Sequence, residues 1–412
     1  MDGKIEEADS ISGLPPFILH KILSYLPPED SARTAELSKR WNSVWNSYPI
    51  FEFHQSTYIK EYDRYDETLC KFLKFVDKSL QKFNRNELRM EKLDLDMLIV
   101  DPNFVPMINT WLPLALNNGA SDIYFNVSPL YRGPPEDYYP LPETTFKTIR
   151  SSKFYHLKKL NLSSVDISQN IIQDIIQNCP NICHLVLWFF RGMKTLEISK
   201  LDKLETLKIG LRREIECVSV DAPSLKHFVF ISYEKNLPCV INLASCYNLK
   251  SMHLSNCSIT DELLHSFLSK FSLLEDVKLK QCHMLRRIRI SGHRLKSLEL
   301  SNDEIEAIEI DAPNLSKFNF GTKKIMPVLF SENVTRFTMN VDYTFTTTHG
   351  RIGSFWFLKL REFLGVSAQS INLKVTFVHN KVCLILWVCD YFLLLLLYLF
   401  ALHLFSSDIL LF

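Results

Sequence analysis

The sequence predicts an α + α/β fold, in which a short N-terminal unit of three helices is followed by a solenoid of repeated strands. Two observations carry this prediction. The first 50 residues place apolar side chains at helical spacing between pairs of prolines. From residue 90 to 380, a short apolar signature recurs every 19 to 25 residues. Such a recurrence over so long a stretch favours an elongated repeat and not one globular core.

Composition and charge narrow the classes of function. The chain has 47 Lys and Arg against 46 Asp and Glu, whereas a protein that coats a polyanion usually carries a large basic excess, so we expect no nucleic-acid partner. The ten cysteines form no CxxC pair and no zinc-like spacing with histidine. The acidic N-terminus lacks the apolar stretch of a secretory signal. We therefore expect free thiols, no metal, no cofactor, and a place in the cytoplasm, the nucleus or both.

The helical unit begins after Leu14-Pro15, because proline suits the first turn of a helix. One apolar stripe then follows the predicted helix, and it consists of Ile18, Leu19, Ile22, Leu23 and Leu26. Pro27-Pro28 ends this helix, since the residue before a proline is driven out of the helical region. Ser38 is a predicted cap for a later helix that presents Trp41 and Trp45 one turn apart.

These residues closely resemble a plant F-box. Leu14-Pro15, the Ile/Leu stripe and Leu26-Pro27 stand where the family's motif has them, and so do Arg33-Thr34 and Leu37-Ser38-Lys39-Arg40-Trp41. Ser31 departs from the pattern, because the family more often has Ala or Val there. The resemblance assigns residues 10–50 to an F-box, and the helical spacing that follows predicts a linker helix within residues 51–89.

The resemblance implies a function as the substrate-recognition subunit of an SCF-type ubiquitin-protein ligase. The F-box would bind a Skp-type adaptor, which joins a cullin scaffold and its RING subunit, so that the chain itself is no enzyme and acts by bringing a target close. The sequence offers no catalytic motif in conflict with this. The residues expected to bind the adaptor through an exposed apolar patch are Leu14, Pro15, Ile18, Leu19, Ile22, Leu26, Leu37 and Trp41.

Residues 90–380 carry the repeats. The signature is an apolar residue, two variable residues, and then an apolar–variable–apolar triplet. Its central positions are Leu160, Leu185, Leu207, Phe228, Met252, Val277, Leu298, Phe318 and Phe337, preceded by degenerate units at Leu93–Leu95 and Ile123–Phe125. This period is that of leucine-rich repeats, so a ribonuclease-inhibitor-like horseshoe is expected. Two near-identical DAP turns, at Asp221 and Asp311, resemble the irregular repeats of plant F-box/LRR proteins; the FBD module of that family is not recognisable.

In each repeat strand the variable residues should share one face. Most are polar, but Val186, Trp188, Val229 and Ile231 are apolar, and they are the predicted site for an unidentified target protein, unless helices or loops cover them. A basic cluster from Arg286 to Lys296 could meet an acidic or phosphorylated target, or be a solvated face. Cys257 and Cys282 follow their strands at a turn position, where core thiols are expected.

The C-terminal segment, residues 381–412, loses the repeat pattern. Residues 382–405 comprise 24 residues with Asp390 as the one charged side chain, long enough to cross a hydrocarbon core of about 30 Å. One interpretation is a tail anchor, which would tether the protein to a membrane. The other is translated intron sequence, because this composition suits thymine-rich codons and a buried aspartate would be costly in lipid.

Two other interpretations remain open from the sequence alone. One is a non-degradative F-box/LRR scaffold or ligand sensor, or a non-functional gene product. The other is a membrane-tethered leucine-rich-repeat protein, if the tail is genuine.

Overall fold

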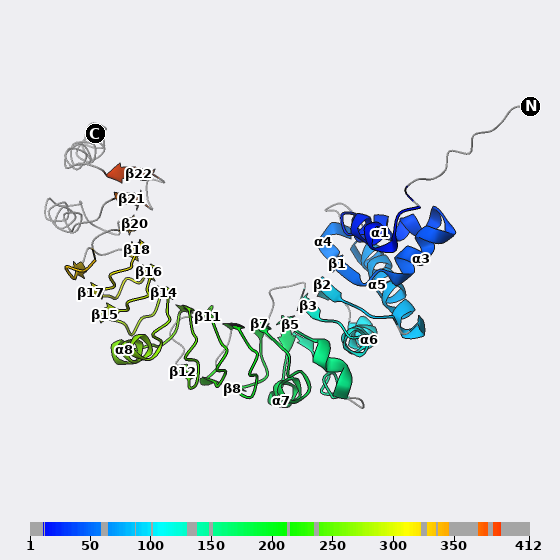
Figure 1. The fold of residues 1–412 in the computed structure, drawn as a ribbon, viewed down its shortest axis with the longest axis horizontal. Coiled ribbons are helices and arrows are strands. Elements are labelled where there is room, and N and C mark those ends of the chain that lie inside the picture. The colour runs from blue at the N-terminus through cyan, green and yellow to red at the C-terminus, as the bar shows by residue number, and fades with distance from the viewer. Residues whose placement is uncertain are drawn as a thin grey trace, which may run out of the picture. The chain divides into compact units, whose positions relative to one another are not determined.

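The computed structural model of the 412-residue chain divides into two compact units, Met1–Met193 and Lys194–Phe412 (Figure 1). The structure describes residue 11 and the ranges 13–58, 65–86, 88–99, 102–129, 138–147, 151–211, 215–234, 239–322, 328–334, 337–345, 370–377 and 382–388.

The first unit opens with the helices that the proline and apolar patterns predict. These are α1 (Pro16–Leu23), α2 (Pro28–Arg33), the 3-10 turn η1 (Thr34–Glu36) and α3 (Lys39–Ser47). Proline occupies the first turn of both α1 and α2, where its missing N–H costs no hydrogen bond. The predicted cap of α3 is confirmed, because the Ser38 hydroxyl accepts a hydrogen bond of 3.1 Å from the Trp41 amide.

A strand follows the helices at once. β1 (Ile50–His54) pairs in parallel with β2 (Lys92–Ile99), so that Phe51 lies beside Leu93 and Phe53 beside Leu95. Both phenylalanines are buried. The segment 51–89, to which the sequence assigns a linker helix, therefore also supplies the first strand of a sheet. It continues with α4 (Gln55–Tyr58) and the long α5 (Tyr65–Asn86).

The sheet of the first unit runs in the order β1-β2-β3-β5-β7 and is parallel throughout. Its later members are β3 (Asp122–Pro129), β5 (Lys159–Ser163) and β7 (His184–Phe190). The elements between and after these strands are η2 (Pro102–Phe104), α6 (Val105–Asn117), β4 (Tyr139–Pro140), η3 (Ser151–His156), β6 (Val165–Asp166) and α7 (Gln169–Asn178). Figure 1 shows α6 and α7 on one side of these strands. Leu95, Phe125 and Leu162 pair in register, as the repeat signature predicts.

The second unit repeats the same step. Its parallel strands lie in the order β9-β11-β13-β14-β16-β18-β20-β21. Their bounds are β9 (Thr206–Leu211), β11 (His227–Ser232), β13 (Ser251–Ser255), β14 (Asp276–Lys280), β16 (Ser297–Ser301), β18 (Lys317–Thr322), β20 (Thr338–Phe345) and β21 (Ser370–Phe377). The predicted signature residues Phe228, Met252 and Val277 stand side by side and are fully buried.

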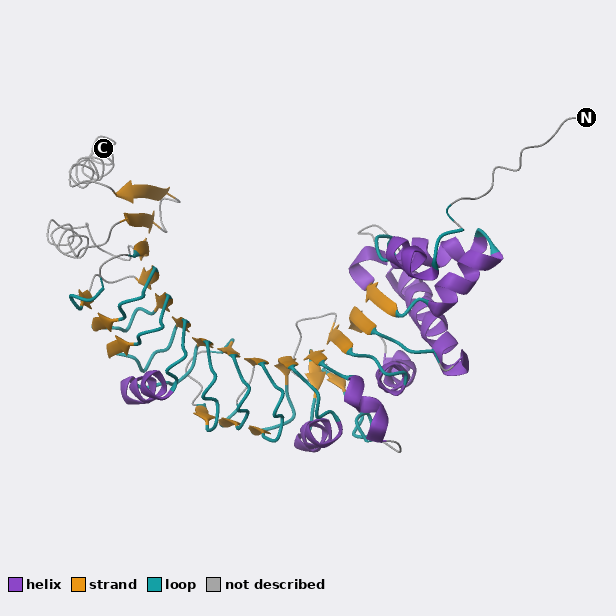
Figure 2. Cartoon of the chain, in the orientation of Figure 1, coloured by secondary structure: helices purple, strands orange, loops and turns teal. Residues whose placement is uncertain are grey.

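Shorter elements form the other side of this unit. One small sheet holds β8 (Thr195–Ile198), β10 (Cys217–Val220) and β12 (Val240–Leu243), and another holds β15 (Arg287–Ser291), β17 (Ala307–Asp311) and β19 (Val328–Phe330). Helix α8 (Asp261–Lys270) lies between them in the chain (Figure 2). The two DAP turns end β10 and β17, and in both the alanine is buried.

The core of the second unit is the space between the two strand layers. Each repeat contributes the two inward residues of its main strand, such as Phe228 and Phe230, and the inward residues of its outer strand, such as Val218 and Val220. Full burial of a side chain of this size contributes about 1.5–3 kcal/mol relative to exposure. Because each repeat buries its apolar residues against its neighbours, one repeat alone has no complete core.

One register differs from the sequence prediction. The signature places Phe337 beside Phe318, whereas the structure pairs Phe318 with Met339 and Lys317 with Thr338. Both Phe337 and Met339 are buried and two residues apart, so the alternation of apolar residues allows either register, and the pairing of neighbouring strands decides. Arg336, the variable residue that precedes Phe337 in the signature, lies outside the described residues.

The last described strand lies inside the segment predicted to be an apolar tail. β22 (Val382–Val388) pairs antiparallel with β21, in a register that places Leu373 opposite Leu386 along the backbone. The rest of the predicted span, residues 389–405, lies outside the described residues. Within the described ranges, no helix combines the length and apolar character needed to cross a bilayer.

Candidate functional site

The N-terminal helices form a small module held by backbone-directed hydrogen bonds. The Arg40 guanidinium on α3 donates to the Leu14 carbonyl oxygen at 2.6 Å, which ties the entry of α1 to α3. The His20 ring of α1 lies 3.2 Å from the Val44 carbonyl oxygen. Trp45 and Tyr48 stack with ring centroids 6.2 Å apart. We call residues 14–48 the helical module.

Ser31, the residue that departs from the F-box pattern, is buried in this module. Its hydroxyl donates to the Leu23 carbonyl oxygen at 3.0 Å, at the C-terminal end of α1, where carbonyl groups lack a partner within the helix. A small apolar residue at this position would fill the same space without that hydrogen bond. The departure is therefore compatible with the fold of the module.

The structure divides the eight predicted adaptor-binding residues into two groups. Exposed or half-buried side chains belong to Leu14, Pro15, Ile18, Ile22, Leu26 and Leu37. Leu19 and Trp41 were expected in the exposed patch, but the structure buries both in the core, where they are only 0% and 6% exposed. Both lie on the side where α1 and α3 pack together. Only part of the apolar stripe of α1 is exposed. Helical periodicity identifies the stripe but does not distinguish its exposed residues from its buried ones.

Two large exposed side chains were missed by the sequence reasoning. Phe17 is 69% exposed and Tyr25 is 75% exposed, whereas a folded chain usually covers rings of this size. Phe17 lies off the predicted stripe, and Tyr25 follows the end of α1. Leu37, between η1 and α3, is 71% exposed. The sequence could have identified Phe17 as a large apolar residue next to the stripe. Its exposure, however, follows only from the packing of α1 on α3.

Helix α5 packs against the module through Lys82. Its ammonium nitrogen donates to the Trp45 carbonyl oxygen at 2.7 Å and lies 4.0 Å from the centre of the Trp45 ring. No carboxylate among the described residues forms an ion pair with it, and burial lowers the pKa of Lys82 to about 7. A polar groove of about 1060 Å³ separates α5 from α2, η1 and α3.

The second candidate surface is the outward face of the main strands. In the second unit their parallel register aligns the variable residues into rows across the strands. One row holds Lys208, Val229, His253, Lys278, Glu299 and Asn319. The next row, two residues further along each strand, holds Gly210, Ile231, Ser255, Lys280, Ser301 and Gly321. The predicted alternation is confirmed, since the residues between these rows are buried.

The four predicted target-binding residues lie on strands of two different units. Val186 and Trp188 are on β7, with the Trp188 ring 6.0 Å from that of Phe189. Val229 and Ile231 are on β11 and belong to the two rows described above. All four are half-buried. Their part in binding a target stays a prediction.

The basic cluster is largely neutralised by glutamates of the neighbouring repeats. Arg286 pairs with Glu304 at 2.7 Å, and Arg289 pairs with Glu309 at 2.6 Å across β15 and β17. Further pairs join Arg287 to Glu306 and Lys296 to Glu275. The cluster is therefore a solvated face of paired charges, and its part in binding an acidic or phosphorylated target stays a prediction.

The cysteines show the environment of core thiols. The Cys257 and Cys282 sulfurs lie 3.6 Å apart in successive turns, both buried, and Cys282 contacts the Leu254 carbonyl oxygen at 3.7 Å. A hydrogen bond with Cys282 and burial raise the pKa of the Cys257 thiol, which makes it a poor nucleophile. Across the described ranges, His, Cys, Asp and Glu side chains nowhere gather in a group able to hold a metal ion.

Comparison with protein families agrees with this division of the chain. The family model of the F-box domain matches residues 11–53. The model described as FBD-associated F-box protein At5g56370, LRR repeats, matches residues 138–246. The model described as At1g61320/AtMIF1, LRR domain, matches residues 236–382. The strands of the second unit up to β21 thus fall within regions that resemble leucine-rich repeats.

Several curated proteins of Arabidopsis thaliana are similar over most of the chain. F-box/LRR-repeat protein At3g03360 is 26% identical over 72% of this chain and 62% of its own length. Putative F-box/LRR-repeat protein At3g18150 is 27% identical over 72% of this chain and 63% of its own length. F-box/LRR-repeat protein At3g26922 is 27% identical over 70% of this chain and 95% of its own length. The chain therefore spans less than two thirds of the first two relatives.

Proposed function

The chain is a plant F-box/LRR-repeat protein, and from this premise we propose that it is the substrate-recognition subunit of an SCF-type ubiquitin ligase. F-box/LRR-repeat proteins are typically non-catalytic adaptors, and an F-box domain generally binds a Skp-type adaptor. In this proposal the helical module binds that adaptor, and the leucine-rich repeats hold a target protein. Ubiquitin transfer then depends on the raised local concentration of the target near the charged conjugating enzyme.

The exposed apolar side chains of the helical module are the single observation that carries the proposal. Phe17, Tyr25 and Leu37 are each more than two thirds exposed, and Ile18 and Leu26 are over a third exposed. Large apolar side chains grouped on one small module mark an interaction site. An adaptor that covers them would gain the burial that the chain alone does not provide.

The buried members of the predicted set have a different role. Leu19 and Trp41 shape the module from within, so their replacement would unfold it and would not report on the interface. The proposed contact residues are therefore Leu14, Pro15, Ile18, Ile22, Leu26 and Leu37, together with Phe17 and Tyr25.

Adaptor capture tests the proposal. The full chain is mixed with a purified plant Skp-type adaptor, and binding is measured by calorimetry for wild type, for Phe17→Asp with Leu37→Asp, and for a Lys39→Asp control on the exposed side of α3. Truncating a central interface side chain typically costs about 2 kcal/mol or more, so the double variant should lose measurable binding while the control retains it. Equal affinities of the double variant and wild type would refute the assignment.

Ubiquitin transfer distinguishes this function from a scaffold or ligand sensor. A reconstituted complex of adaptor, cullin and RING subunit should ubiquitinate proteins that accumulate in plant cells lacking the helical module. If the adaptor binds but no protein accumulates, the non-degradative function is favoured.

We also propose that the repeats form a horseshoe-like solenoid and that the protein acts in the cytoplasm or nucleus. The parallel registers of β9 to β21 support the first of these. Small-angle scattering of the full chain tests it, and imaging of the native protein tests the second. Tethering to a membrane through residues 382–405 remains the alternative, which carbonate extraction of native membranes would detect.

A further inference from the structure

The strand face of the second unit carries an apolar pair and a cationic pair at a fixed separation. Val229 and Ile231 lie on β11, and Lys278 and Lys280 occupy the matching rows on β14. One strand, β13, lies between them and contributes His253 and Ser255 to those rows. Since neighbouring strands are about 4.8 Å apart, the two pairs are separated by about 10 Å.

The lysine pair has more positive charge than its neighbours compensate. Glu299 on β16 serves both lysines, at 2.6 Å from the Lys280 nitrogen and 3.7 Å from the Lys278 nitrogen. One carboxylate therefore faces two ammonium groups, and both lysine side chains remain more exposed than the glutamate between them. On the far side of the apolar pair, Lys208 has no ion-pair partner within the described ranges.

A titratable neighbour responds to this surplus. Burial lowers the pKa of His253, and Lys280 and Lys278 lower it further, against the smaller opposing effects of Glu299 and Asp276. Asp276 accepts a hydrogen bond of 3.2 Å from the Ser251 hydroxyl and keeps its negative charge, but its effect on His253 is smaller than that of either lysine. The field above β13 and β14 is therefore positive on balance, and it would favour an added carboxylate.

We propose that this face binds an extended segment of a target protein in which an apolar side chain is followed, about three residues away, by an aspartate or glutamate. The apolar side chain packs on Val229 and Ile231, and the carboxylate meets Lys278 and Lys280. In an extended chain of polyproline II type, residues three apart lie on the same side and about 9 Å apart, which matches the separation of the two pairs. This inference rests on the proposed function, because it specifies the target that the receptor would hold.

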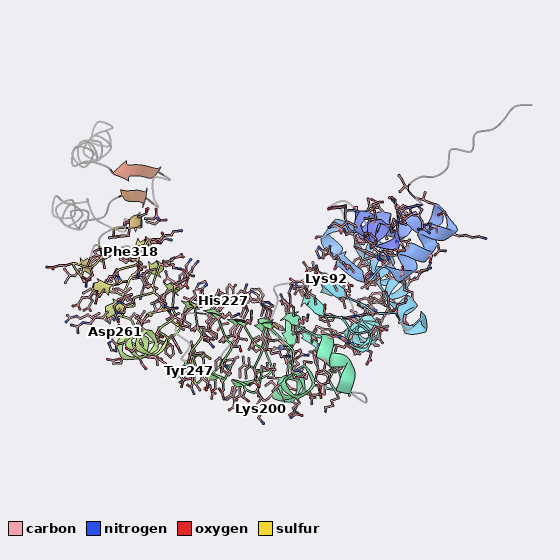
Figure 3. The ribbon with its side chains drawn as sticks, in the orientation of Figure 1. Lys92, Lys200, His227, Tyr247, Asp261 and Phe318 are labelled. Carbon is pink, nitrogen blue, oxygen red and sulfur yellow. The ribbon has the colours of Figure 1, made fainter. Side chains whose placement is uncertain are left out.

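A peptide-display experiment on the full chain tests it. The probe is a phage library of random 12-residue peptides, selected in parallel on three proteins: wild type, Lys278→Glu with Lys280→Glu, and Lys200→Glu with Arg294→Glu. The last variant changes the net charge equally but at exposed positions, with Lys200 in the turn after β8, away from the main strands (Figure 3). A fourth variant, Val229→Thr with Ile231→Thr, removes apolar surface while keeping β-branched side chains.

Wild type and the Lys200/Arg294 variant should both select peptides with an acidic residue about three positions from an apolar one. The Lys278/Lys280 variant should bind these peptides at least about tenfold more weakly and should select basic residues in their place. The Val229/Ile231 variant should lose the preference for the apolar residue. Circular dichroism of each variant verifies its folding, and if the Lys278/Lys280 variant fails to fold, the single Lys278→Gln change replaces it.

Three results would overturn the inference: no enriched peptides, enrichment without an acidic preference, or an acidic preference unchanged by reversal of the two lysines. Binding of a random single-stranded RNA in place of peptides, lost in the Lys278/Lys280 variant, would also overturn it and make the face a nucleic-acid site. Adaptor binding is measured on the helical module, so a failure of the proposed function is seen separately from a failure here.

Discussion

Replacement of Lys82 by methionine tests how the helical module is joined to α5. The Lys82 nitrogen donates to the Trp45 carbonyl oxygen at 2.7 Å and lies among the rings of Trp45 and Phe51, at 4.0 and 4.8 Å from their centres. Methionine keeps the length of the side chain and removes its charge. Because burial lowers the pKa of Lys82 from 10.5 to about 7, the change should alter stability in a way that depends on pH.

The sign follows from proton binding. Between pH 7 and 10.5 the unfolded chain keeps the Lys82 proton while the folded chain has lost it, so the free energy of unfolding of wild type rises with pH in this window. Below pH 7 both states hold the proton, and the full cost of burying the charge remains. Each pH unit corresponds to at most about 1.4 kcal/mol, and partial exposure reduces the total to about 2–4 kcal/mol.

Urea unfolding followed by tryptophan fluorescence measures the effect, because Trp41 and Trp45 both lie in the module. The difference in unfolding free energy between the methionine variant and wild type should be largest at pH 6.5 and shrink steadily towards pH 10. Lys78→Met, at an exposed position one turn earlier in α5, is the control and should show a constant difference. Parallel pH profiles for wild type and the Lys82 variant would refute this account of the α3–α5 contact.

Three further predictions concern Ser31, the two core cysteines and strand β22. Ser31→Ala should destabilise the helical module by up to about 1 kcal/mol in thermal or urea unfolding, because the Leu23 carbonyl oxygen loses one of its two donors and keeps the Leu26 amide; an increase in stability would contradict the role given to the hydroxyl. Cys257 and Cys282 should resist iodoacetamide in the folded chain and react at once in urea, as peptide mass spectrometry can show; rapid labelling of the native protein would mean that the turns open. A chain that ends at residue 388 should keep β22, whereas one that ends at 381 exposes the edge of β21 and should aggregate more readily in light scattering; equal behaviour would show that the β21–β22 pairing adds nothing.

Local patterns determined much of this protein. Prolines and an apolar stripe predict α1, and Ser38 marks the start of α3, because helix ends depend on a few neighbouring residues. The recurring signature locates the main strands from β2 to β18, since alternation of buried and exposed residues is a property of each strand alone. The F-box motif likewise lies within one continuous stretch, which a family model matches at residues 11–53.

Packing between distant segments decided the rest. Leu19 and Ile18 are adjacent in the same stripe, yet Leu19 is buried and Ile18 is exposed, because α3 covers one side of α1. The arginines of β15 resemble a basic patch until the glutamates near and on β17, 18 to 20 residues later, stack beside them. The register of β20 is set by its pairing with β18, because the apolar alternation in the β20 sequence is compatible with two different registers. Burial and charge pairing depend on which neighbour covers a residue, and only the tertiary structure supplies that neighbour.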